Sequence, residues 1–134
     1  MLLVDIRLLK QDYELELQEM QQEIQKSLDP SEIVGAITSG TPLKVVRGVQ
    51  RAACRGAERL FTIVPPEDIE DAHTRLSTSM RDYAADLERL AHQVEKGTMS
   101  FTEFSATLSH LESAERLRAA GDEIRMMGYS MAAT

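Results

Sequence analysis

The stretch 66–96 constrains the fold more than any other part of this chain of 134 residues. Its candidate core positions alternate spacings of four and three residues without a break: Ile69, His73, Leu76, Met80, Tyr83, Leu87, Leu90 and Val94. An α-helix places residues at these spacings on one face, whereas a strand would need alternation at every second residue. The pattern therefore predicts a long helix that buries one continuous seam against other helices, as in a bundle or coiled coil.

Start and stop signals divide the rest of the chain into further helices. Prolines at positions 30, 42, 65 and 66 suit the first helical turn, where a missing N–H costs nothing. Gly97 and Gly128 are typical of helix ends, and Ser100 with Glu103 forms a capping-box pattern. We therefore expect main helices at 2–28, 42–63, 66–96 and 101–127, with a short helix or irregular linker at 30–39.

Composition and the length of the connections predict how these helices are arranged. Aromatic residues make up only 4% of the chain and Trp is absent, so the core must be built from aliphatic residues, which suits helices. Short connections force antiparallel neighbours. We predict an all-α protein: a single domain over residues 1–134, folded as an antiparallel up-and-down bundle of four main helices plus a short helix after the first.

The helix expected at 42–63 carries a row of basic residues in an acidic protein of net charge -7. The row consists of Lys44, Arg47, Arg51, Arg55 and Arg59. On a helical wheel these side chains cover an arc of roughly 120° opposite the apolar arc. They therefore lie where any amphipathic helix has its polar residues. What is unusual is that their charge is positive in a protein that is negative overall. Residues 43–62 contain five basic residues and one acidic residue, Glu58, between two acidic flanks.

Three interpretations of this row stay open. The arginines at its edges can pair with acidic faces of neighbouring helices, formed by Glu16, Glu19 and Glu23 or by Asp82, Asp86 and Glu88. Alternatively, the row docks an acidic protein or an anionic membrane surface. Nucleic acid is the least favoured partner, because aromatic stacking residues and a known DNA-reading motif are lacking and the flanks repel a polyanion.

The sequence gives no pattern for catalysis. Glu70 and His73 have the spacing of a di-iron bundle motif, but such sites need two of these motifs and two further glutamates. We expect instead that His73 is buried and hydrogen-bonded to a neighbouring side chain or carbonyl group. The lone Cys54 excludes an internal disulfide, and no phosphate loop, zinc spacing or nucleophile elbow is present. We predict no enzyme activity, no metal and no cofactor.

The N-terminal run MLLVDIRLL is apolar but contains Asp5 and Arg7, unlike the core of a signal peptide. No apolar run is long enough to span a bilayer. These features favour a cytoplasmic protein if the chain is as given, or an envelope or secreted protein if it is a mature fragment.

The region 60–127 resembles a broad group of small bacterial envelope proteins, many of them lipoproteins of unknown function. The resemblance rests on Pro65 and Pro66 after a helix, His73 in an acidic-x-x-H step, and Gly97 in a short turn. It implies a helical bundle outside the cytoplasm without catalytic residues. The chain departs from the group because it lacks a lipobox cysteine and a signal sequence.

Two functions remain as expectations. The first is a non-catalytic interaction protein that binds a protein partner, or itself, through helix faces, with Arg47, Arg51, Arg55 and Arg59 as contact residues. The alternative is a carrier or sensor of a small ligand, with a pocket between helices where His73 and Tyr83 provide polar contacts.

Overall fold

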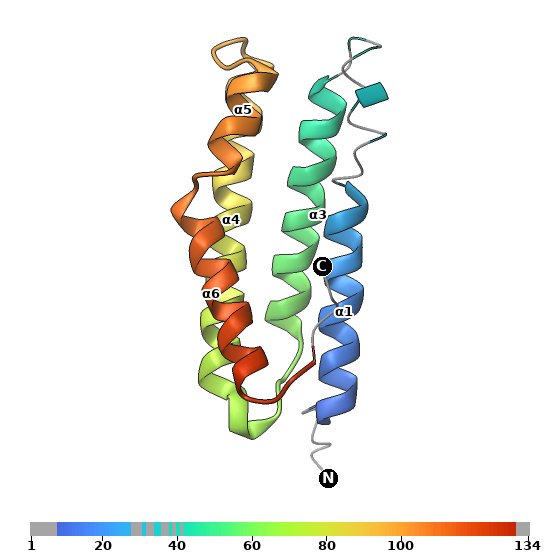
Figure 1. Cartoon of the computed structure of the whole chain (residues 1–134), viewed down its shortest axis with the longest axis vertical. Helices are drawn as coiled ribbons and strands as arrows, with labels where there is room; N and C mark the ends of the chain where they lie inside the picture. Colours follow the sequence, from blue (N-terminus) through green and yellow to red (C-terminus); the bar gives the residue numbers. More distant parts are fainter. Residues whose placement is uncertain are drawn as a thin grey trace, which may run out of the picture.

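The computed structural model describes residues 8–27 and 42–130, together with Ser31, Val34, Gly35, Thr38 and Gly40 between them. The helices are α1 (Lys10–Ser27), α3 (Pro42–Thr62), the 3-10 turn η1 (Glu67–Ile69), α4 (Glu70–Glu95), α5 (Phe101–Leu108) and α6 (Glu112–Met126) (Figure 1). Residues 1–7 and most of the predicted short helix at 30–39 lie outside this description. Within that predicted helix, Thr38 Oγ donates a hydrogen bond to the Val34 carbonyl oxygen at 2.8 Å, a helical spacing.

The chain is all-α, and its four main helices, α1, α3, α4 and α6, pack antiparallel, as predicted. Helix α3 packs against α1 on one side and α4 on the other, while α6 covers another face of α4 (Figure 1). The described residues contain no strand. Because α3 is flanked on both sides, its remaining outer face is the one on which the basic residues lie.

The predicted boundaries hold at several points. Helix α3 begins at Pro42, and Gly97 takes a φ of 78° just after α4, where glycine fits without strain. Ser100 accepts a hydrogen bond from the Glu103 N–H at 3.1 Å, and the Glu103 side chain binds back, which completes the capping box of α5.

Two predicted helices are corrected. The last helix, expected over 101–127, is broken into α5 and α6 at residues 109–111. Leu111 adopts an extended backbone, which buries its side chain, and Glu112 and Glu115 then lie in a new first turn, where the helix dipole favours negative charge. The first helix, expected from residue 2, begins only at Lys10, because the Leu8 N–H donates to the Val64 carbonyl oxygen at 2.8 Å and so ties this segment to the end of α3.

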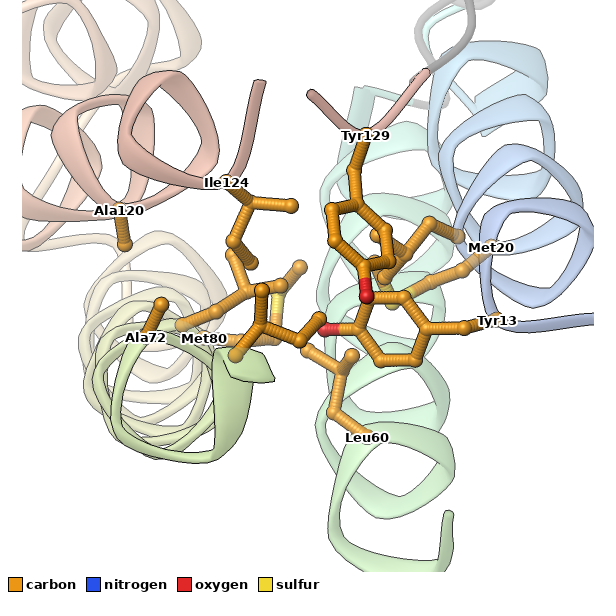
Figure 2. Close-up of a cluster of buried hydrophobic side chains, with 11 residues drawn as sticks. Tyr13, Met20, Leu60, Ala72, Met80, Ala120, Ile124 and Tyr129 are labelled. Atoms are coloured by element: carbon orange, nitrogen blue, oxygen red, sulfur yellow. The ribbon is translucent and has the colours of Figure 1, made fainter. Parts of the chain in front are cut away.

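The core consists of two packed clusters. The lower core lies where α1 starts and α3 ends, and the upper core lies between α3, α4 and α5. The lower core comprises Tyr13, Leu17, Met20, Leu60, Ile69, Ala72, Leu76, Met80, Ala120, Ile124 and Tyr129. The upper core comprises Val46, Val49, Ala53, Ala84, Leu87, Leu90, Ala91, Phe104 and Leu111. Figure 2 shows side chains of the lower core converging from the separate helices.

The predicted seam of 66–96 is confirmed, with Tyr83, between the two cores, and Val94, at its end, only half-buried. Leu9 and Phe61 follow the apolar periodicity of the helices expected at 2–28 and 42–63, but they are exposed, at 74% and 72%. Leu9 precedes α1 rather than lying within it. Phe61 lies on the last turn of α3, at the edge of the apolar arc. Periodicity alone therefore overestimates burial at helix ends.

Candidate functional site

The basic row of α3 points away from the core because the opposite side of the helix is held in it. Val46, Val49 and Leu60 are each at most 2% exposed. They fix the rotation of α3, so the arc centred opposite them, with Arg51 and Arg55 at its middle, lies on the outside. Both middle arginines are exposed, as the helical wheel predicts.

At the lower edge of the row, Arg59 binds α1. Its Nε donates to Glu16 Oε2 at 2.6 Å, and its guanidinium group also pairs with Glu19. The hydrogen bond to Glu16 raises the pKa of Arg59 above its ordinary value, because it favours the charged form. This is the pairing that the first interpretation expected for an edge residue, and it joins α3 to α1.

At the upper edge, Arg47 binds α4. Its guanidinium group pairs with Glu95 at the end of α4, and its Nη1 also donates to Gln50 Oε1 at 3.3 Å. The acidic partner on α4 is therefore Glu95 rather than Asp82, Asp86 or Glu88. Both edge arginines help to position the helices beside α3.

The two middle arginines differ from the edge residues. Arg51 Nε donates to the Arg47 carbonyl oxygen at 3.3 Å, one turn back along α3. Within the described part of the chain, neither Arg51 nor Arg55 pairs with a carboxylate. In the part of the chain that the structure describes, these two guanidinium groups therefore form no ion pair that joins α3 to a neighbouring helix.

An open groove of about 460 Å³ lies beside this row, between α3 and α4. Its lining consists of Arg47, Ala85, Glu88, Arg89 and His92. The four residues from α4 share one face, since they are spaced by three, one and three residues. Arg89 binds Asp86 on its own helix at 3.1 Å. No sequence pattern marks Ala85 or Arg89 as site residues, because only the packing of α3 on α4 brings them next to Arg47.

His73, the other predicted site residue, is buried and fully hydrogen-bonded. Its Nε2–H donates to the Leu60 carbonyl oxygen at 2.9 Å, because a carbonyl group can only accept. In the neutral ring, Nδ1 then carries no proton and accepts from the Tyr13 hydroxyl at 2.7 Å. Burial lowers the pKa of His73, partly offset by the bond to Leu60. The prediction of a buried, hydrogen-bonded histidine is confirmed.

Tyr83 lies half-buried where the two cores meet, and burial raises the pKa of its hydroxyl. The open groove is lined by other residues, and both ring nitrogens of His73 are occupied. The ligand-carrier hypothesis therefore gains no support from His73 and stays a prediction.

Tyr129, after the end of α6, is buried in the lower core, which no sequence pattern predicts. Its ring meets Tyr13 edge to face at 5.7 Å, as Figure 2 shows, and its hydroxyl donates to Asp68 at 2.8 Å. Burial first, and then the bond to Asp68, raises the pKa of Tyr129 to about 12. Its place in a short tail after Gly128 gave no periodic signal.

In the described residues, no group of three or more His, Cys, Asp or Glu side chains is arranged to hold a metal ion. None of the helices described is both long and apolar enough to cross a membrane. Comparison with protein-family models, curated proteins and solved structures found no match for this chain. The resemblance to small bacterial envelope proteins thus stays a prediction.

Proposed function

We propose that this protein is a non-catalytic interaction protein that binds an acidic protein surface, on another protein or on a second copy of itself, through the outer face of α3. The observation that carries the proposal is the pair Arg51 and Arg55, exposed and without carboxylate partners in the described structure. Arg47 and Arg59 already join α3 to its neighbours, so the middle pair is not needed for that task.

Charge favours a protein over a nucleic acid as the partner. The basic segment 43–62 lies between flanks that are both net acidic, and these would repel a long polyanion. The basic face also lies opposite the buried face of α3, so it offers no apolar side for insertion into a lipid surface. A short acidic patch on a protein is repelled less by the acidic flanks and needs no apolar side for insertion.

Light scattering across a range of protein concentrations, combined with capture of partners from a cell extract, tests this proposal. We expect either a concentration-dependent oligomer or specific retention of an acidic protein, with binding that weakens as salt is added. A protein that stays strictly monomeric and retains no partner would contradict the proposal.

A further inference from the structure

We infer that the groove between α3 and α4 binds an acidic segment of the partner, whose carboxylates pair with the guanidinium groups of Arg51 and Arg89 beside Arg47, which stays paired with Glu95. The inference rests on the proposed function, since it assigns the partner's chemistry and its place on the same surface. The groove and the exposed row adjoin, because Arg47 belongs to the row and also lines the groove, and Arg51 follows it one turn along α3.

Arg89 is held by a pair that a ligand can replace. The side chains of Arg89 and Asp86 are 60% and 30% exposed, and they share one hydrogen bond of 3.1 Å. A guanidinium group has five donors, so most of those on Arg89 remain for a carboxylate of the partner. Asp86 has a second use, because its other oxygen accepts from Ser113 at 2.6 Å, which holds it toward α6. It therefore stays satisfied when Arg89 turns to a ligand.

The lining also limits what kind of segment fits. Ala85 is the only small side chain in the lining, so it leaves room for a peptide backbone or a short side chain. Glu88 lies in the same lining and repels a continuous run of negative charge. The groove therefore suits a segment whose carboxylates are spaced by small residues, rather than a polyanion with charge at every unit.

A fluorescently labelled peptide of Glu–Ala repeats, with a Gln–Ala peptide of equal length as its neutral counterpart, probes this groove in the full chain. We expect the Glu–Ala peptide to bind and the Gln–Ala peptide not to bind. Ala85→Trp, which fills the groove, and Arg89→Glu should each weaken binding by about tenfold or more. Ala119→Trp, at an exposed alanine on α6, is the matched control and should bind as the original protein does. Thermal unfolding of each variant verifies that the fold survives.

The groove inference is overturned if Ala85→Trp binds the Glu–Ala peptide normally, if the two peptides bind alike, or if a thymidine oligonucleotide binds more tightly than either. Partner capture by the same variants separates this inference from the proposed function. Capture that is lost on charge reversal of Arg51 and Arg55 but unchanged in Ala85→Trp overturns the groove and leaves the proposed function standing. No capture and no self-association by the original protein removes the proposed function itself.

Discussion

His73 shows how a single buried residue links three helices. Its ring accepts from Tyr13 on α1, donates to Leu60 on α3, and is carried by α4. In the neutral ring, Nδ1 accepts from the Tyr13 hydroxyl while Nε2–H donates to the Leu60 carbonyl oxygen. Protonation of Nδ1 would force the Tyr13 hydroxyl to turn and accept instead, and it would place a positive charge in a buried site, which lowers the pKa of the ring.

The stability of the protein should therefore depend on the charge of His73. The folded protein holds the pKa of this residue below 6.5, its ordinary value, so the unfolded chain takes up the proton first as the pH falls. The free energy of unfolding should decrease below about pH 6.5 until the pH reaches the lowered pKa of the folded state. Urea unfolding at a series of pH values measures this slope. His73→Gln should be less stable and flatten the slope, whereas an unchanged slope would contradict the assignment.

The Tyr13 hydroxyl should contribute to the stability of the fold, although the side chain lies in an apolar core. Tyr13→Phe leaves the buried Nδ1 of His73 without its donor, which should lower the free energy of unfolding by about 1–3 kcal/mol. Tyr83→Phe is the control, because the Tyr83 hydroxyl makes no hydrogen bond within the described part of the chain. Denaturant titration compares the two variants, and equal losses would argue against a specific role for the bond between Tyr13 and His73.

At the scale of the elements, α3 contains two glycines in different surroundings. A Cβ added at Gly48 would meet no atom within 4 Å, whereas one added at Gly56 would meet Met20 Cγ at 3.3 Å. Gly48→Ala should therefore raise the free energy of unfolding by about 0.5–1 kcal/mol, because alanine favours the helix. Gly56→Ala should gain less, since Met20 must move. Thermal unfolding ranks the two, and a larger gain at Gly56 would contradict this description of the α1–α3 contact.

The helices that the sequence predicts best are those whose signals are local and continuous. The seam from Ile69 to Val94 and the capping box at Ser100 needed no tertiary information. The break at residues 109–111 was missed, because the periodicity of 101–127 continues across it, while the burial of Leu111, which favours the bend, depends on tertiary contacts. Burial of a single side chain against other helices is not visible in a helical wheel.

One part of the candidate site can be predicted from the sequence, and another part cannot. The outward direction of Arg51 and Arg55 follows from the spacing within one helix, so the sequence predicts it. The groove depends on how α3 and α4 lie together, and it combines Arg47 with Arg89 and His92, which are more than forty positions away along the chain. No periodicity within one helix links such residues.

At the scale of the whole molecule, charge has two separate uses. Pairs from Arg47 to Glu95 and from Arg59 to Glu16 and Glu19 join α3 to the acidic helices beside it. Exposed pairs of this kind contribute only about 0–1 kcal/mol each, but they favour one arrangement of neighbours over others. The positive charge that remains at the middle of the row has no such use within the described fold.

Charge reversal at the middle of the row tests the central claim most directly. We expect Arg51→Glu combined with Arg55→Glu to unfold at nearly the same temperature as the original protein and to lose partner binding or self-association. The control, Arg118→Glu with Arg125→Glu on α6, changes the net charge equally and should keep binding, because these exposed residues lie on a different helix and the pair of Arg125 with Asp122 is within α6. If the variant with Arg51→Glu and Arg55→Glu is folded and its binding is unchanged, the row is only the solvated side of a helix.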